Sequence, residues 1–521
     1  MTDTRTPTTE RSTASNFRQR RFLGLAVLGA MLAPFAATSS GNLSSPQTSS
    51  NLSCATAKPV LTANDIEYLG AIRVPATGVD ARYSYGGLTG RMVNGRAHLF
   101  IYGNNVPQDP TLKDWVYELE DPGGGYTTDY TMAPRARLVT TWGDIYHGKR
   151  LYYDYDRNDG STWFSGYTTP EGLYWNEQTH LLYWTYFNAY NVTGYPDVGL
   201  GATSLDDPNT GTSTSYGPWR VTVTDGDGAT HYGPWRCLYL FGNPLDGSMM
   251  CGSHIQSGAA RSPWGPDAYG GAPWPTASTP AGFNRPDIHM PNRYLEYYYM
   301  GSSNTGNYVD SNGVVHGHLR SARRSFETPV WENYAAIHND TLRANPSTNG
   351  GVTSWSEMDA TSGAAWLELS NKRGVVFVTT LAGAVSQDVN DCVNTAHVWY
   401  GNAGVNPPYG ACSHGCGPVG ATGPSSTAMF PSFTIYDPDD LVAVRNGSKV
   451  DYTVEPRSVI DLGRSYGIRT ADVNNIGAFR TIRGIWFDPV RKYLFVLAPQ
   501  SDGTLGTYSI MPLIHVFAIH D

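Results

Sequence analysis

Four stretches of this chain repeat one pattern: a glycine, a few apolar or aromatic residues, a polar turn, and a second run rich in β-branched and aromatic residues. They are Gly87–Tyr102 (GLTGRMVNGRAHLFIY), Gly172–Tyr186 (GLYWNEQTHLLYWTY), Gly363–Thr379 (GAAWLELSNKRGVVFVT) and Gly484–Leu497 (GIWFDPVRKYLFVL). Two such runs on either side of a polar turn predict a β-hairpin. We therefore expect each stretch to supply two antiparallel strands of one repeated unit.

The recurrence of this unit indicates the architecture. Antiparallel units repeated along a chain are typical of β-propellers, in which four-stranded blades surround a central channel. The repeats begin 85, 191 and 121 residues apart, and blades of about 40–50 residues would place two in the first interval and more in the others. We predict an all-β fold, a β-propeller of about seven blades. Five, six or eight blades are the alternatives, and a pair of β-sandwiches is the main competing fold.

The composition agrees with an all-β chain. The 521 residues include 57 Gly, 34 Pro, 34 Tyr and 14 Trp, and only 16% are charged. Glycine and proline favour turns, and aromatic side chains favour strands. We also expect strands at residues 66–75 (IEYLGAIRVP) and 512–519 (PLIHVFAI). Pairing of strands from the two ends would close the ring and leave no exposed sheet edge.

The N-terminal segment has the features of an export signal. An arginine pair, Arg20–Arg21, precedes an apolar run that ends at Ala33. The run has the length of a signal-peptide core and is too short to span a bilayer. The residues RRFL resemble a twin-arginine signal that lacks the usual spacer residue. We predict a signal peptide over 1–37, a flexible Ser/Thr-rich linker over 38–59, a propeller over 60–521, and a secreted or periplasmic location reached by the twin-arginine or general secretory route.

The charge balance excludes several classes of partner. The whole chain has a net charge of −9, and residues 1–37 carry five arginines and two acidic residues, so the rest of the chain has a net charge of −12. An acidic chain without basic runs is unsuited to nucleic acids or anionic membrane surfaces. We expect neither as a partner once the signal is cleaved, and we expect a monomer.

All six cysteines follow the predicted signal, and an even number in an exported protein favours disulfides. Cys237 and Cys251 flank the run LYLFGNPLDGSMM, which predicts a hairpin. We therefore predict a disulfide between Cys237 and Cys251. The sequence leaves the pairing of the other four open: Cys54, Cys392, Cys412 and Cys416.

Residues 154–163 (DYDRNDGSTW) resemble the Asp-box of sialidase-like propellers through Asn158, Gly160, Thr162 and Trp163. The resemblance implies a turn within a blade and no catalytic role. The alternating oxygen side chains at the start of this segment are also compatible with calcium, although Asp159 stands where a calcium loop has glycine. We expect no metal site and no cofactor, with calcium as the one ion worth considering.

The residues just before the repeat glycines are the main candidates for a site. They are Gly86, Glu171, Ser362 and Arg483, and the start of each innermost strand lies at the channel mouth of a propeller. Glu171 could act there as a general acid or base, and Arg483 could hold a substrate carboxylate. A structural salt bridge that lines the channel is an equally weighted alternative.

Further candidates come from neighbouring segments. Arg82 and Tyr85 precede the first repeat, and His254 lies in the loop CGSHIQSG. Arg293 and Glu296 lie in the aromatic strand RYLEYYY, where Glu296 could instead pair with an arginine of an adjacent strand. We predict Glu171, Arg483, His254 and Tyr85 as catalytic residues, and Arg82, Arg293 and Glu296 as substrate-binding residues.

The blade-like repeats, such as GLYWNEQTHLLYWTY, resemble those of secreted bacterial β-propeller proteins, and more loosely those of propeller-type polysaccharide lyases. The resemblance implies an enzyme acting on an extracellular acidic polysaccharide. In a lyase, Arg483 and Arg82 would neutralise a uronate while His254 and Tyr85 move the protons. A glycoside hydrolase would need two carboxyl groups, for which Glu171 and Glu296 are the candidates. The alternative is a non-catalytic propeller that binds or organises surface glycans or proteins.

Overall fold

The computed structural model of this protein describes parts of the chain from Lys58 to Asp521. By internal contacts the chain divides into Met1–Thr56 and Ala57–Asp521, and all described residues belong to the second unit. The predicted signal peptide and most of the predicted linker lie outside them. The described ranges are 58–82, 84, 86–103, 115–147, 154–156, 162–165, 168–188, 198–224, 230–232, 237–253, 265–275, 287–295, 308–309, 315–316, 360–383, 428–449, 451, 454–468, 482–505 and 511–521.

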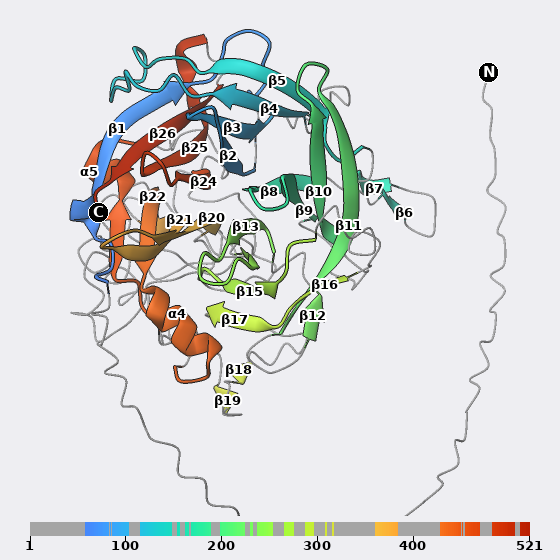
Figure 1. Ribbon diagram of the computed structural model, residues 1–521, viewed down its shortest axis with the longest axis vertical. Helices are drawn as coiled ribbons and strands as arrows, with labels where there is room; N and C mark the ends of the chain where they lie inside the picture. Colours follow the sequence, from blue (N-terminus) through green and yellow to red (C-terminus); the bar gives the residue numbers. More distant parts are fainter. Residues whose placement is uncertain are drawn as a thin grey trace, which may run out of the picture. The chain divides into compact units, whose positions relative to one another are not determined.

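Five sheets of four or more strands in the described residues surround one axis (Figure 1). Their innermost strands contact one another in a closed circle, in the order β2, β8, β13, β20, β24 and back to β2. The structure is thus a five-bladed β-propeller. The predicted all-β propeller is confirmed, and five blades is one of the alternatives that the sequence left open. The innermost strands are β2 (Leu88–Val93), β8 (Thr168–Asn176), β13 (Tyr239–Gly242), β20 (Ala360–Glu368) and β24 (Arg483–Asp488).

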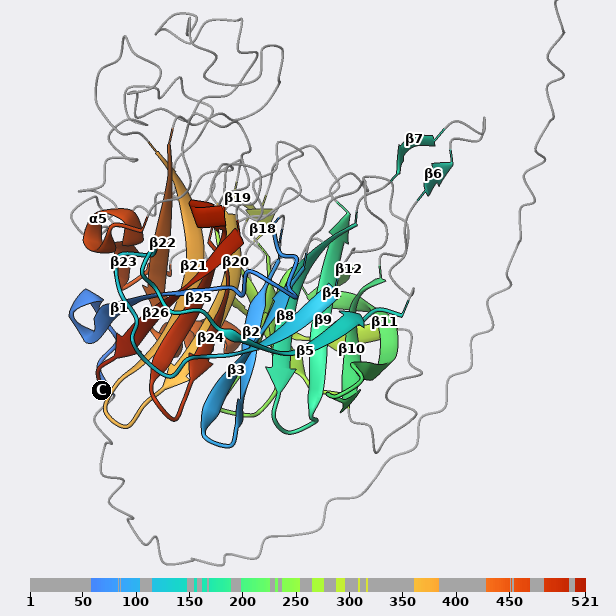
Figure 2. The ribbon, with the colours of Figure 1, turned by 90° about the horizontal axis from the view of Figure 1, so that it is seen from above.

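Each blade continues outward from its innermost strand through antiparallel neighbours. In Figure 2 the propeller is seen from the side, with the β2–β3 turn at the lower edge of the drawing. The first blade adds β3 (Arg96–Tyr102), β4 (Trp115–Glu120) and β5 (Arg137–Asp144); the second adds β9 (Leu181–Asn188), β10 (Val198–Asp207), β11 (Thr212–Thr224) and β12 (Thr230–Tyr232), with β16 (Asp287–Met290) parallel to β11; the third adds β14 (Met249–Gly252), β15 (Ala268–Ala272) and β17 (Asn292–Leu295).

The last two blades have the same plan. The fourth adds β21 (Arg373–Gly383), β22 (Ala428–Tyr436) and β23 (Ser458–Asp461) to β20; the fifth adds β25 (Tyr493–Asp502), β26 (Met511–Ile519) and β1 (Ile66–Arg73) to β24. The remaining elements are the hairpins β6–β7 (Asp154–Asp156, Thr162–Ser165) and β18–β19 (Tyr308–Val309, Val315–His316), the helices α4 (Pro438–Arg445) and α5 (Leu462–Tyr466), and the short 3-10 helices η1 (Ala63–Asp65) and η4 (Gly503–Leu505). No helix in the described part of the chain is long and apolar enough to cross a membrane.

All four predicted hairpins are confirmed as the two inner strands of a blade: β2–β3, β8–β9, β20–β21 and β24–β25. The fifth, β13–β14, is the hairpin expected between the cysteines, although its first strand lacks the glycine signature. The predicted closure is also confirmed, because β1 pairs with β26 from Ile66–Ile519 to Arg73–Leu513. In Figure 1 these strands, blue and red, lie side by side.

Five apolar cores fill the spaces between neighbouring blades. Successive residues of one inner strand alternate between two of these cores: Ala364 and Trp366 face the third blade, while Ala365 and Leu367 face the fifth. Because side chains alternate across a strand, both faces of an inner strand are buried. This explains why the repeats are continuous apolar runs and do not alternate with polar residues.

The repeat glycines allow the inner strands to touch backbone to backbone. A Cβ at Gly363 would lie 3.1 Å from the Gly484 Cα, and one at Gly484 would overlap the Leu88 nitrogen. A Cβ at Gly87 would lie 2.6 Å from the Leu173 nitrogen, and one at Gly172 would lie 2.7 Å from the Leu238 oxygen. Any side chain at these positions would push neighbouring blades apart.

The structure does not show the predicted disulfide between Cys237 and Cys251, whose side chains are both buried thiols. Cys251 in β14 lies opposite Leu240 of β13, and Cys237 comes two residues before the start of β13. The two thiols are hydrogen-bonded to each other, and burial raises the pKa of Cys251. Cys251 Sγ also lies 3.2 Å from Met290 Sδ.

We predict that Gly484→Ala lowers the free energy of unfolding by about 3 kcal/mol or more. Gly484 has a φ of +64°, a conformation that costs other residues about 1–2 kcal/mol, and overlap with the Leu88 backbone adds a packing cost of about 1–3 kcal/mol. Urea unfolding followed by tryptophan fluorescence measures the loss.

Gly447→Ala is the matched control. Gly447 has a φ of +71°, and nothing lies within 4 Å of its Cβ position. This variant should therefore lose only the conformational cost of about 1–2 kcal/mol. Equal losses in the two variants would contradict the role assigned to the backbone contact at Gly484.

Candidate functional site

Glu171 and Arg483 meet at the start of the inner strands. Glu171 lies in β8, within a register shift between Pro170 and Leu173, and Arg483 is the first residue of β24. Arg483 Nη1 lies 3.1 Å from Glu171 Oε2. Both strands flank β2, so the ion pair joins the second and fifth blades across the start of the first.

The local chain geometry aims both side chains. Each precedes a repeat glycine, and the ladder of each inner strand shifts register there, as it does again before Gly363 in β20. A bulge turns a side chain out of the regular alternation of a strand. The side chains of Glu171 and Arg483 can therefore meet near the start of the inner strands, because neither follows the regular alternation that fills the cores between the blades.

The pair is almost buried: 11% of the Glu171 side chain and 14% of the Arg483 side chain are exposed. Burial raises the pKa of the Glu171 carboxyl above its usual value, and the Arg483 charge offsets only part of this rise. A carboxyl group with a raised pKa keeps its proton at higher pH and can donate it to a bound molecule.

Arg483 retains an unused donor. Its Nε atom is buried and makes no hydrogen bond with any residue that the structure describes. A buried donor without an acceptor costs about 1–3 kcal/mol, and an oxygen atom of a bound molecule would remove this cost. The guanidinium can thus hold Glu171 with one nitrogen and a ligand with another.

Three side chains that the sequence analysis did not select hold the Glu171 segment in place. Thr185 Oγ1 accepts a hydrogen bond from Gly172 N at 2.8 Å and donates one to Leu238 O at 2.6 Å. The Tyr102 hydroxyl donates to Gly172 O at 3.2 Å, and the Tyr146 hydroxyl donates to that of Tyr102 at 2.9 Å. Thr185 stands out in the sequence as the one hydroxyl-bearing aliphatic residue in the run LLYWTYF.

A comparable contact positions Arg483. Ser362, the residue before the repeat glycine of β20, donates a hydrogen bond from Oγ to Ile482 O at 2.7 Å. Ser362 therefore anchors the chain immediately before Arg483. Of the four residues that precede the repeat glycines, three contribute to one site: Glu171 and Arg483 as the ion pair and Ser362 as its support.

Two other predicted site residues, Arg82 and Arg293, form ion pairs with acidic residues. Arg82 forms a bidentate ion pair with Asp80, in which Nε lies 2.9 Å from Oδ1 and Nη2 lies 2.7 Å from Oδ2. Arg293 lies in β17, the outermost strand of its blade, where its Nε is 2.9 Å from Asp451 Oδ2. Tyr85, His254 and Glu296 lie outside the described residues.

The described residues contain no group of three or more His, Cys, Asp or Glu side chains that could hold a metal ion. The segment that resembles an Asp-box contains the hairpin β6–β7, and the turn between its strands lies outside the described residues. The calcium possibility therefore stays a prediction.

Comparisons with known proteins give similarities to solved structures only. No protein-family model matches the sequence, and no curated protein matches it. A glycosyl hydrolase from Bacteroides ovatus is 9% identical, with 88% of this chain and 92% of that chain covered and a TM-score of 0.32. The GH43_1 enzyme from Xanthomonas citri complexed with xylotriose is 10% identical, with 86% and 90% covered and a TM-score of 0.31.

A third structure is described with the GH130 family of mannoside phosphorylases, which contains glycoside hydrolases that target beta-1,2 mannosidic linkages in Candida mannan. It is 9% identical, with 88% of this chain and 96% of that chain covered and a TM-score of 0.32. Similarities at this level carry no information about the chemistry of this chain. The assignment as a propeller rests on its own sheet topology.

We predict that ionisation of Glu171 destabilises the folded protein. Because its pKa is higher in the folded chain than in the unfolded chain, the folded state holds the proton longer. The stability of the wild type relative to Glu171→Gln should therefore fall as the pH rises above about 4.5, with a slope of up to about 1.4 kcal/mol per pH unit. Urea unfolding of both proteins between pH 4 and 8 measures this difference.

For Glu118→Gln we expect the opposite pH dependence of the stability difference from the wild type. Burial acts to raise the pKa of Glu118, but His98, Arg91 and Trp142 hold the carboxylate and lower its pKa overall. Its contribution to stability is therefore present above the unfolded pKa and is lost as the pH falls. The same trend in both variants would contradict the assignment for Glu171.

Proposed function

We propose that this protein is an exported glycoside hydrolase that cleaves an extracellular polysaccharide at the mouth of the propeller channel, with Glu171 as the proton donor. The observation that carries the proposal is the nearly buried Glu171–Arg483 pair at the start of the inner strands. The predicted export signal supports an extracellular substrate, and the raised pKa of Glu171 suits an acid that works near neutral pH.

The charge balance of the pair favours hydrolysis over the lyase mechanism. In a lyase the positive charge of Arg483 would have to neutralise the carboxylate of the substrate, but Glu171, 3.1 Å from Arg483 Nη1, competes for that charge. Cleavage of a glycosidic bond needs a protonated carboxyl group beside the leaving oxygen. In this proposal Glu171 donates its proton to that oxygen as the bond to the anomeric carbon breaks, and the oxygen of a water molecule forms the new bond to that carbon. The second carboxyl group, which accepts the proton of the water, is assigned to Glu296, which lies outside the described residues. The negative charge left on Glu171 is stabilised by Arg483.

Arg483 has a second role in the proposal. Its buried Nε lacks an acceptor among the described residues, so it can donate to a hydroxyl group of the sugar. That contact would orient the leaving oxygen toward Glu171, since one planar group would hold both. The partner is therefore a glycan, and the reaction requires no cofactor for the proton transfer.

We predict that Glu171→Gln lowers kcat by about 10²–10⁴-fold on natural polysaccharides, the range typical of lost acid catalysis. The same variant should lose much less on aryl glycosides with a dinitrophenol leaving group, because such a group departs without a proton. Reducing ends released from xylan, mannan and arabinan, together with dinitrophenol release, provide the two measurements.

Glu171→Asp is the conservative control and should restore part of the turnover. Products with the absorbance of an unsaturated uronate would instead support the lyase alternative. If Glu171→Gln kept full turnover but lost stability, the pair would be a structural salt bridge between the second and fifth blades. The non-catalytic propeller would then be the better interpretation.

Removing the Arg483 charge should shift the pH profile upward. Because Arg483 holds down part of the rise in the pKa of Glu171, Arg483→Met should raise that pKa further. The alkaline limb of the plot of log kcat/KM against pH should then move to higher pH, while kcat/KM itself falls. Arg373→Met is the control, because it removes an arginine of the fourth blade that pairs with Asp439. It should leave the pH at which kcat/KM falls on the alkaline side unchanged. A downward shift with Arg483→Met would refute the proposed coupling.

A further inference from the structure

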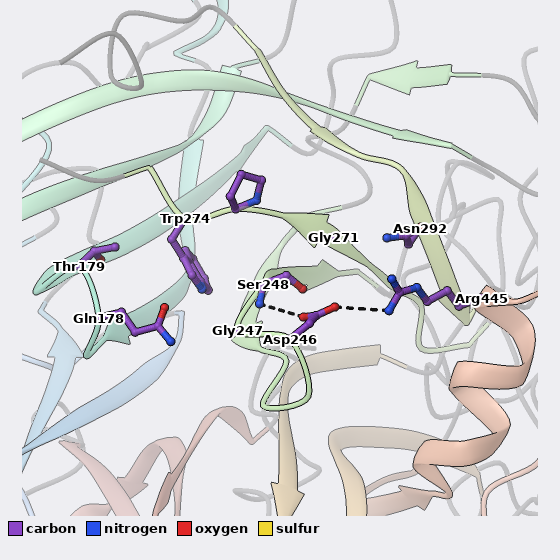
Figure 3. A pocket seen from close by; sticks show the side chains of 10 residues that line it. Gln178, Thr179, Asp246, Gly247, Ser248, Gly271, Trp274, Asn292 and Arg445 are labelled. Carbon is purple, nitrogen blue, oxygen red and sulfur yellow. Dashed lines mark hydrogen bonds and ion pairs between the residues drawn. The ribbon is translucent and has the colours of Figure 1, made fainter. Parts of the chain in front are cut away.

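A pocket lies beyond the end of β8, whereas Glu171 lies near the start of that strand. It has a volume of about 400 Å³, within the range of about 300–1,000 Å³ typical of small-molecule sites. The turn after β8, the turn after β13, the strands β15 and β17, and helix α4 all contribute to it (Figure 3). The residues on which the argument depends are Gln178, Asp246, Ser248, Trp274, Asn292 and Arg445.

We infer that this pocket binds a neutral sugar unit, separately from the channel mouth and independently of the reaction proposed there. Its charged side chains are one aspartate and one arginine, so the lining has no net charge. Arg445 Nη1 is 3.4 Å from Asp246 Oδ2, and the two side chains are 35% and 34% exposed. Both partners therefore remain accessible to hydroxyl groups.

Neighbouring residues hold the side chains of Arg445 and Asp246 in place. The Tyr294 hydroxyl lies 2.9 Å from Arg445 Nη1, and the guanidinium also packs over the Tyr294 ring at 5.5 Å. Asp246 Oδ1 accepts a hydrogen bond from Ser248 N at 3.0 Å, as the dashed line in Figure 3 shows. A pre-organised donor and acceptor bind a ligand without the cost of ordering them first.

Ser248 supplies the observation that points to a ligand. Its side chain lines the pocket, the residue is 8% exposed, and its buried Oγ makes no hydrogen bond within the described residues. A buried hydroxyl without a partner costs about 1–3 kcal/mol. A sugar hydroxyl in the pocket would satisfy it.

Two glycines make room for two side-chain amides. A Cβ at Gly247 would lie 3.2 Å from Gln178 Nε2, and a Cβ at Gly271 would overlap Asn292 Nδ2. Both glycines have positive φ angles, +68° and +90°; Gly247 lies in the turn after β13, and Gly271 lies at a register shift within β15. Amide groups both donate and accept hydrogen bonds, which matches the hydroxyl groups of a sugar.

Trp274 supplies the apolar part of the site. Its ring stacks on Tyr174 at 5.0 Å and packs against Tyr183 at 4.6 Å, so 7% of the residue is exposed. Figure 3 shows the indole between Gln178 and Ser248. It offers a fixed apolar surface for the C–H groups of a sugar ring, and the other pocket residues supply amide, hydroxyl and charged groups.

The test is calorimetric titration of the mature chain with xylotriose, mannotriose and maltotriose. We expect at least one to bind in the millimolar range or tighter. Ser248→Ala and Gln178→Ala should each weaken that binding by about fivefold or more. Because the Ser248 hydroxyl has no hydrogen-bond partner among the described residues, Ser248→Ala should leave thermal stability unchanged or raised.

Glu171→Gln separates this site from the channel mouth, since it should abolish turnover of polysaccharide and leave the titration unchanged. Three outcomes would overturn the inference: no binding of any of the three sugars, binding that neither pocket variant weakens, or binding that Glu171→Gln weakens as strongly as Ser248→Ala. Failure of the proposed hydrolase activity alone would not affect it, because binding is measured without turnover.

Discussion

Close backbone contact between neighbouring inner strands is the constraint on which this structure depends. A Cβ atom at any of the four repeat glycines would lie too close to the backbone of the next blade; these are Gly87, Gly172, Gly363 and Gly484. These contacts bring five sheets close enough for apolar cores to form between each pair of blades. Register shifts accompany Gly172, Gly363 and Gly484, and the residues that precede two of these glycines, Glu171 and Arg483, form an ion pair. The close packing of the blades and the candidate site therefore depend on the same short segments, the repeat glycines and the residues that precede them.

The Glu171–Arg483 pair is an expensive feature by electrostatic criteria. Charges removed from water lose hydration that their mutual attraction rarely restores in full, so buried ion pairs seldom contribute much to stability. Here burial raises the pKa of Glu171 despite the adjacent guanidinium, and Arg483 Nε has no described partner. By contrast, Glu118 is fully buried but surrounded by three donors, and its pKa is lowered. The comparison distinguishes a network that stabilises the fold from a pair suited to chemistry.

Much of this organisation could be predicted from the sequence. Hairpins are local, and a polar turn between two apolar runs is sufficient to predict them, so all four repeats were correctly identified. The fifth inner hairpin can be predicted from its turn, but it does not match the repeat pattern, because Leu238 stands where the other inner strands have glycine. The blade number and the cysteine pairing depend on register and on how much chain lies outside the sheets. β11 alone has 13 residues, and Cys251 lies opposite Leu240, neither of which the spacing of residues indicates.

The sequence by itself determined the strands, the turns between them, the closure of the ring by its two ends, and the candidacy of Glu171 and Arg483, because each depends on neighbours in the chain or on the symmetry of a repeat. Only the tertiary structure decided that the two side chains touch across the first blade, that Thr185, Tyr102 and Ser362 hold them, and that a neutral pocket forms beyond the turns of β8 and β13. These features join residues hundreds of positions apart, and their energies depend on burial, which no local pattern specifies.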